Sequence, residues 1–292
     1  VEALGASCIQ NELMSKHTSF SVGGPADLFI TVENAGIMTK LLPLAERYLV
    51  PLTVIGNGSN LLVSDKGVEG AVVKYCDRSV TVSGEKIICG AGAMLSAVSA
   101  AARDSSLGGM EFAYGIPGSI GGAVYMNAGA YGGEMKDRLI WVEYLDLDGN
   151  IQRVPAEKLN LSYRHSCFME QEYQGVCIIR AAFSLEKGEQ TAIQAEMDRI
   201  IGQRKEKQPL DLPSAGSTFK RPQGAYAAQL IDQCGLRGFT VGGAQVSTKH
   251  TGFVVNIGGA TCQDVLELAR QVKECVKEKT GFELEMEVRL LP

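Results

Sequence analysis

The chain has 292 residues, of which 45% are hydrophobic and 21% are charged, a balance typical of folded globular proteins and unlike that of disordered chains. This length is sufficient for two or three domains with a substantial apolar core. The formal net charge of −5 argues against nucleic acid as the main partner, because chains that bind this polyanion usually carry a basic excess.

The cysteines and the apolar runs indicate a cytoplasmic protein. The eight cysteines are scattered without a C-x-x-C pair, and only three histidines accompany them, so we expect reduced thiols and no metal site. No apolar run of the sequence reaches the eighteen residues needed to span a bilayer, and residues 1–10 lack the pattern of a signal peptide. We therefore expect no membrane insertion. The first residue is Val rather than Met, as at a trimmed or processed end.

The first third of the chain predicts alternating helices and short strands. A helix is expected over 34–49, where apolar residues recur at helical spacing, although Pro43 favours a kink or an early end. Glycine and charged residues separate the apolar runs that follow, which is typical of strands. Strands are expected at 52–56, 60–64, 70–75 and 86–91, and a helix rich in small residues at 93–107.

A glycine-rich passage over 108–133 precedes the second set of elements. The run "IWVEYLDLDGNIQRVP" (140–155) alternates apolar and polar residues around Asp148-Gly149, which predicts a hairpin. Thr261 and Gly281 have the character of a helix N-cap and a helix stop. The remaining predictions are strands at 176–185, 251–259 and 283–291, and helices at 189–207, 225–235 and 261–279.

These elements predict an α+β protein with an N-terminal region in two parts and a C-terminal α/β domain. We place the N-terminal region at 1–188, divided near residue 75, and the C-terminal domain at 189–292. The connection is expected near residues 188–207.

The stretch "VIGNGSNLLVS" (54–64) places two glycines, a serine and two asparagines between strand-like runs. Backbone N–H groups exposed by glycine, together with Ser and Asn donors, can hold a pyrophosphate. A tight turn between strands explains the same pattern equally well. The spacing fits neither a Walker A loop nor a G-x-G-x-x-G motif.

A second stretch, "GIPGSIGGAVYMNAGAYGG" (115–133), contains seven glycines. Such density is costly in conformational entropy and is typical of a loop folded against a planar or anionic ligand. A flexible surface loop is the alternative. The apolar residues between the glycines favour an ordered, partly buried loop.

Together these two stretches strongly resemble the FAD-binding region of the UDP-N-acetylenolpyruvoylglucosamine reductase (UDP-N-acetylmuramate dehydrogenase) family. The resemblance continues in order through "HTSFSVGGPAD", "LSYRHS", "SAGSTFKRP" and the terminal "LEMEVR", and so covers nearly the whole chain. It implies a vanillyl-alcohol-oxidase-like (PCMH-type) FAD-binding region followed by a substrate-binding domain. It also implies an NADPH-dependent reductase that converts UDP-N-acetylglucosamine-enolpyruvate to the peptidoglycan precursor UDP-N-acetylmuramate.

The resemblance assigns roles to particular residues. It implies catalytic roles for Arg164, Ser217 and Glu287, and substrate contacts for Tyr163, Lys207 and Arg221. The FAD contacts that it implies are Gly56, Asn57, Gly58, Ser59, Asn60, Pro117, Gly118, Ser119, Gly121, Gly122, Asn127, Ala128 and Gly129. With no histidine or cysteine in either FAD loop, we expect FAD to be held noncovalently.

Local pattern alone would not select the catalytic residues. Arg164 would be interpreted as a surface arginine, and Glu287 as a solvated residue of an alternating strand. Ser217 has no histidine nearby in sequence and has two basic residues close behind it, so a proton donor is a better interpretation than a nucleophile.

The sequence also departs from the family pattern. Arg221 stands where other members carry Asn, and Met286 replaces a proline of some members. Only 15 residues, 165–179, separate Arg164 from Arg180, which resembles the shorter class without a tyrosine lid loop.

Two other functions compete with the reductase. Another flavoprotein of the same fold, such as an oxidase, would use the FAD loops without the later motifs. A non-catalytic nucleotide-sugar binding protein would tolerate the loss of Arg164, Ser217 or Glu287, yet all three are present. We expect small-molecule partners, UDP-sugar and NADPH, and a monomer or weak oligomer.

Overall fold

The computed structural model describes the backbone of residues 1–292 and every side chain except that of Glu2. The chain forms two compact units, each assembled from three segments. Unit 1 comprises Val1–Gln10, Leu28–Asn57 and Gly70–Gln203, and unit 2 comprises Asn11–Asp27, Gly58–Glu69 and Arg204–Pro292. These compact units are defined by contacts and not by function. The predicted boundaries of the functional domains near residues 75 and 188 therefore stay a prediction.

Unit 1 contains two larger sheets, two two-stranded sheets and most of the helices. A four-stranded sheet has the order β1-β2-β5-β3, and a five-stranded antiparallel sheet has the order β12-β11-β13-β7-β6. The first consists of β1 (Ser7–Leu13), β2 (Pro25–Val32), β3 (Leu52–Ile55) and β5 (Val68–Tyr75). The second consists of β6 (Val80–Ser83), β7 (Lys86–Gly90), β11 (Leu139–Leu145), β12 (Ile151–Pro155) and β13 (Cys177–Ser184).

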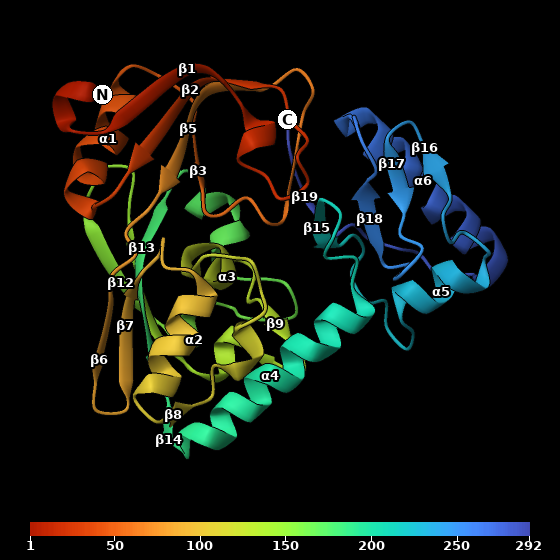
Figure 1. The fold of residues 1–292 in the computed structure, drawn as a ribbon. Helices are drawn as coiled ribbons and strands as arrows, with labels where there is room; N and C mark the ends of the chain where they lie inside the picture. Colours follow the sequence, from red (N-terminus) through yellow and green to blue (C-terminus); the bar gives the residue numbers. More distant parts are fainter. The chain divides into compact units, whose positions relative to one another are not determined.

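Two short helices cover the five-stranded sheet (Figure 1). These are α2 (Leu95–Asp104) and α3 (Ile120–Tyr125), and their apolar faces meet the sheet in one core. The fully buried members of this core include Ile87, Leu95, Ile120, Val142 and Phe183. Because α2 precedes the glycine-rich passage and α3 lies within it, this packing holds that passage in place.

Helix α1 (Ala35–Arg47) confirms the helix predicted at 34–49, with the Asn34 side chain accepting the Ile37 N–H at 3.1 Å as its N-cap. Pro43 lies inside the helix and does not end it. Proline has no N–H for the carbonyl four residues earlier, here that of Thr39.

Gly149 lies in the turn between β11 and β12 and has φ +80°. It packs against the Thr39 carbonyl oxygen, with which any Cβ at this position would collide. The predicted hairpin is therefore confirmed, and its glycine is required.

Unit 2 is built on an antiparallel sheet of order β15-β18-β17-β16, with α6 packed along β16 and β17 (Figure 1). Helix α6 begins at a capping box between Thr261 and Asp264 and ends at Gly281 with φ +75°, as the sequence predicts. The elements are β15 (Ser214–Ser217), α5 (Ala227–Gln233), β16 (Thr240–Val241), β17 (Ala244–Val246), β18 (Phe253–Asn256) and α6 (Cys262–Thr280).

The strand predicted over 283–291 is wrong for most of its length. Strand β19 forms only at Arg289–Leu291 and pairs in parallel with β4 (Leu61–Val63). Before it, Met286 makes a single antiparallel bridge with Phe219. The segment changes partner within a few residues, so no continuous ladder develops although Leu284 and Val288 are buried.

The remaining elements are short apart from α4 (Gln190–Lys207), which confirms the helix predicted at 189–207. Four two-residue strands are β8 (Leu107–Gly108), β9 (Gly129–Ala130), β10 (Gly133–Glu134) and β14 (Glu186–Lys187). Single 3-10 turns occur at Glu2–Leu4, Met14–Lys16, Glu111–Ala113, Met135–Asp137, Ala156–Lys158, Cys167–Met169 and Gln171–Tyr173. Among the described residues, no helix combines the length and the apolar character needed to cross a bilayer.

Candidate functional site

The two glycine-rich stretches are called here the first glycine loop (54–64) and the second glycine loop (115–133). In unit 1, the start of the first glycine loop contacts the second glycine loop. Asn57 follows β3, and its Nδ2 donates to the Pro117 carbonyl oxygen at 2.7 Å. A Cβ at Gly56 would lie 2.3 Å from Ser119 Oγ, so a larger residue there would displace this hydroxyl. Glycine therefore lets the two loops approach each other with the Ser119 hydroxyl in its present position.

A third segment, residues 91–95, supports the second loop and was not singled out from the sequence. Its backbone makes three hydrogen bonds with that loop: Leu95 N–H to Gly118 O at 3.1 Å, Ile120 N–H to Ala93 O at 2.9 Å and Gly121 N–H to Ala91 O at 2.8 Å. A Cβ at Gly121 would lie 3.0 Å from that of Ala91. The glycine pair of "CGAGAM" at the end of a strand was the signal that could have indicated it.

The environment of Ser119 indicates whether these loops suit an anionic cofactor. Its hydroxyl is buried, with the residue 3% exposed, and makes no hydrogen bond with any described residue. Buried polar atoms almost always have a partner, so an unpaired hydroxyl beside Gly56 favours a ligand atom at this position. A hydroxyl donor next to glycine backbone suits a phosphate oxygen, so the residues present fit the FAD pyrophosphate.

In unit 2, the rest of the first glycine loop is tied to residues 17–19. Gly58 has φ +66°, and any Cβ there would collide with the His17 carbonyl oxygen. Ser19 N–H donates to Gly58 O at 3.2 Å, and Ser19 Oγ donates to Ser59 O at 3.3 Å. This part of the loop is therefore fixed through its main chain.

Asn60 links the same loop to the C-terminal segment. Its Nδ2 donates to the Glu287 carbonyl oxygen at 3.1 Å, and its own carbonyl oxygen accepts the Arg289 N–H at 2.9 Å. Within unit 2, Asn60, which is predicted to contact FAD, thus positions the backbone of Glu287, which is predicted to be catalytic.

Arg164 lies in a strained two-residue turn of unit 1. Ser162 and His165 exchange backbone hydrogen bonds of 3.2 and 3.1 Å on either side of Tyr163 and Arg164. Arg164 has φ +56°, a region that residues other than glycine rarely adopt. Its Nη2 donates to Gly129 O at 2.9 Å, and the guanidinium carbon lies 4.9 Å from the centroid of the Tyr163 ring. Backbone strain of this kind persists where a side chain is needed in one place.

Asn127 holds this turn from the second glycine loop. The residue is 0% exposed, and its Nδ2 donates to Ser162 O at 2.9 Å and to Glu134 Oε2 at 2.8 Å. Its Oδ1 accepts the Lys136 N–H at 2.9 Å. The side-chain amide and the main-chain N–H, which donates to Val124 O at 3.1 Å, are thus both committed within unit 1. The neighbouring Ala128 is paired through both its N–H and its C=O.

Ser217 is the last residue of β15 and stands out from the core. Its neighbours Ala215 and Thr218 are buried, while Ser217 is exposed. The pairing of β15 with β18 shifts register before Ser217, at Gly216, which has φ +78°. The bulge turns the serine toward solvent, as a residue that acts on a ligand requires.

Glu287 lies on the segment next to Ser217 within unit 2. Its N–H donates to Thr218 O at 2.8 Å, and Lys220 N–H donates to Glu285 O at 2.8 Å. Lys220 Nζ also pairs with Glu285 Oε1 at 2.6 Å. The structure therefore brings together the segments of two predicted catalytic residues, while Arg164 belongs to unit 1.

The predicted substrate contacts Lys207 and Arg221 both lie in unit 2. Lys207 ends α4 and is exposed, and the Arg221 guanidinium carbon lies 4.3 Å from the centroid of the Tyr226 ring. Gln208, next to Lys207, was not predicted, yet its Oε1 is buried without a hydrogen-bond partner among the described residues. We add Gln208 to the candidate residues on that ground.

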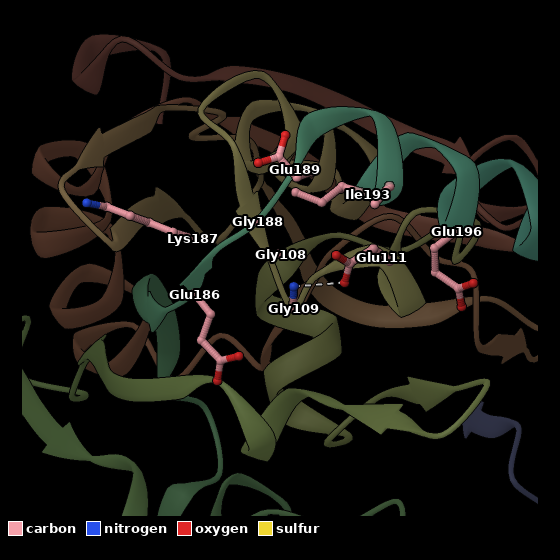
Figure 2. Close-up of a pocket in the computed structure, with 10 residues that line it drawn as sticks. Gly108, Gly109, Glu111, Glu186, Lys187, Gly188, Glu189, Ile193 and Glu196 are labelled. Carbon is pink, nitrogen blue, oxygen red and sulfur yellow. Dashed lines mark hydrogen bonds between the residues drawn. The ribbon is translucent and has the colours of Figure 1, made fainter.

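A shallow pocket of about 310 Å³ in unit 1 contains none of the predicted site residues (Figure 2). Its lining carries four glutamates and one lysine, and Glu111 Oε2 accepts the Gly109 N–H at 2.8 Å. A surface of this charge is unsuited to the phosphates of FAD or a UDP-sugar. The pocket is therefore not the functional site.

Comparison with known proteins supports the interpretation of both units. The FAD binding domain family matches residues 26–155, and the family described as UDP-N-acetylenolpyruvoylglucosamine reductase, C-terminal domain, matches residues 208–291. The reductase of Caldanaerobacter subterraneus subsp. tengcongensis is 48% identical over 96% of this chain and 92% of its own length. That of Lachnoclostridium phytofermentans is 49% identical over the same shares. A crystal structure of the Thermus caldophilus reductase has a TM-score of 0.83 and 36% identity, covering 98% of this chain and 99% of its own.

The fold and the glycine loops define an FAD-binding flavoprotein oxidoreductase. More narrowly, the chain belongs to the UDP-N-acetylenolpyruvoylglucosamine reductase family. The resemblance noted in the sequence, the predicted fold class and the predicted FAD are thereby confirmed. The roles of individual residues stay predictions.

Proposed function

We propose that the chain is an FAD-dependent reductase that uses NADPH to reduce the enolpyruvyl ether of UDP-N-acetylglucosamine-enolpyruvate to UDP-N-acetylmuramate. Family membership supports this reaction. The observation that carries it is the Arg164 turn, in which a guanidinium is held at an unfavourable φ of +56° by Gly129 and Tyr163. Such backbone strain at an arginine is expected where the guanidinium has to be held in one position to bind a negative charge of the substrate.

FAD, when bound, supplies the hydride that reaches the terminal vinyl carbon of the substrate. Electron density then moves toward the substrate carboxylate, and Arg164 stabilises the charge that develops on those oxygens. A planar, permanently charged, bidentate group suits this task better than lysine does.

Carbon-2 of the resulting enolic species has to receive a proton. The Ser217 hydroxyl donates it, forming the new C–H bond, and regains a proton from solvent. Glu287 stabilises the enolic form. Two observations support these assignments: Ser217 is exposed, and the Glu287 N–H donates a hydrogen bond to the carbonyl oxygen of Thr218, next to Ser217.

The glycine loops hold the cofactor without a covalent link. Residues 56–60 would hold the FAD pyrophosphate, and residues 117–122 would form the second FAD loop with Ser119 Oγ as a donor. Residues 127–129 would continue this second loop. Tyr163, Lys207 and Arg221 contact the UDP-sugar. We expect a monomer or weak oligomer in the cytoplasm, where NADPH and the nucleotide sugar are available.

The test is the colour of the purified protein, with flavin absorbance followed anaerobically. NADPH should bleach the flavin band, and UDP-N-acetylglucosamine-enolpyruvate should restore it. A colourless protein that binds the sugar would favour a nucleotide-sugar binder. Bleaching without recovery on the enolpyruvyl substrate would favour another flavoprotein of this fold.

A further inference from the structure

Thr218 is a buried polar residue that no step of the proposed reaction uses. It is 1% exposed and lies between Ser217 and the buried Phe219. We propose that Thr218 is a positioning residue that fixes Ser217 and Glu287 relative to each other for the proton-transfer step. This inference rests on the proposed function and adds to it a residue that does not touch the substrate.

Three polar groups of Thr218 bond to three different residues of unit 2. Its N–H donates to Gly252 O at 2.8 Å, and its Oγ1 accepts the Val254 N–H at 2.9 Å. Its carbonyl oxygen accepts the Glu287 N–H at 2.8 Å. One residue therefore joins the end of β15 both to β18 and to the segment that carries Glu287.

This junction matters because the strand pairing is irregular just before it. The pairing between β15 and β18 shifts register between Ser214 and Ser217, and an added Cβ at Gly216 in that stretch would meet no atom within 4 Å. Ser217 is exposed, so core packing does not hold its side chain. The nearest fixed point after Ser217 is Thr218, and the Oγ1 bond to Val254 sets its depth in the sheet.

The same junction determines where Glu287 lies. Its N–H is bonded to Thr218, while its carbonyl oxygen accepts from Asn60. Asn60 thus ties Glu287 to the predicted FAD loop, and Thr218 ties it to Ser217. Loss of the Thr218 hydroxyl would leave the Val254 N–H buried without an acceptor, and a chain relaxing to satisfy it would shift both catalytic segments.

The experiment compares Thr218→Val with Thr218→Ser in the two half-reactions. Valine keeps the shape and β-branching of threonine but lacks Oγ1, whereas serine keeps Oγ1 and lacks the methyl group. Both variants should bind FAD and be bleached by NADPH at the wild-type rate. Reoxidation by the enolpyruvyl substrate should slow about 10- to 100-fold in Thr218→Val, since misplacement by about 1 Å can cost that much. Thr218→Ser should stay within a few-fold of the wild type.

Two further measurements separate positioning from general loss of structure. The solvent deuterium isotope effect on reoxidation should rise in Thr218→Val, because transfer of the proton to carbon-2 becomes limiting. Thr280→Val is the matched control, since Thr280 Oγ1 also accepts a backbone N–H in unit 2, that of Phe282 at 3.3 Å. It should leave both half-reactions and the isotope effect unchanged.

Several outcomes would overturn the inference. Normal reoxidation of Thr218→Val would do so, and so would equal slowing of the valine and serine variants, which would assign the effect to packing. Slowing of both half-reactions, or an unchanged isotope effect, would reduce Thr218 to a structural residue. Failure of the proposed function is recognised separately, because wild-type flavin would then not be reoxidised by the substrate.

Discussion

The Arg164 turn of unit 1 and the Ser217 strand end of unit 2 both depart from regular backbone, but in different ways. Arg164 adopts the positive φ itself, at +56°. Beside Ser217 the neighbouring Gly216 adopts it, at +78°. Glycine enters this region at almost no steric cost, whereas another residue loses about 1–2 kcal/mol there.

The difference follows from the length of the two side chains. Serine reaches only a short distance from the backbone, so its whole residue is turned outward by a bulge at glycine. Arginine has a long flexible stem, and its head is fixed by the Gly129 carbonyl and the Tyr163 ring. Unfavourable backbone at a charged residue is therefore a stronger sign of function than a glycine beside a serine.

A large effect is expected from Arg164→Lys. The variant keeps the charge but loses the planar fork, so reoxidation by the enolpyruvyl substrate should fall about 10²- to 10³-fold. Bleaching by NADPH should be unaffected. Arg103→Lys, on α2 of the same unit, is the control and should behave as the wild type. Stopped-flow absorbance checks both, and normal reoxidation of Arg164→Lys would refute the assignment of Arg164 to the carboxylate.

A smaller effect is expected from Gly216→Ala. Space is open around Gly216, so any loss comes from φ alone and should be about 1–2 kcal/mol of unfolding free energy. Gly202→Ala is a matched control in α4, because its surroundings are equally open and its φ is not in the positive region. Alanine there should stabilise by about 0.5–1 kcal/mol. Urea titration should show the free energies of unfolding of the two variants moving in opposite directions. A gain of stability in both would mean that the positive φ of Gly216 carries no cost for alanine.

The smallest effect concerns the strain at Arg164. Arg164→Ala and Arg164→Gly both lose the contacts of the guanidinium, but only glycine relieves the positive φ. The glycine variant should therefore be more stable than the alanine variant by about 0.5–1 kcal/mol, the reverse of their order in a helix. Thermal or urea unfolding of the pair measures this. Equal stability would mean that the turn relaxes and stores no strain.

The sequence predicted elements whose signals are local. Thr261 and Gly281 bound α6 because a cap and a left-handed stop act within one turn, and the β11–β12 hairpin followed from its glycine. Strand β6 was missed although its partner β7 is local, in a hairpin that pairs Ser83 with Lys86. The strand over 283–291 was wrong because its pairing depends on distant segments, at Phe219 and at β4.

The candidate site was predictable as a set of residues and not as an arrangement. The ordered motifs named Arg164, Ser217 and Glu287, and FAD is confirmed by the family. The cofactor contact of Asn127 stays a prediction, and its amide also bonds to Ser162, 35 residues away in the chain. Contacts of this kind, like that of Asn60 with Glu287, join distant segments, so spacing in the sequence carries no trace of them.

The most direct test of the account is stopped-flow absorbance of Ser217→Ala, one half-reaction at a time. If Ser217 is the proton donor to carbon-2, the variant binds FAD, and NADPH bleaches the flavin at close to the wild-type rate. Reoxidation by the enolpyruvyl substrate then slows about 10²- to 10⁴-fold, as on losing a positioned acid. Normal reoxidation would contradict the proton-donor role, and equal slowing of both half-reactions would show a defect of folding or cofactor binding instead.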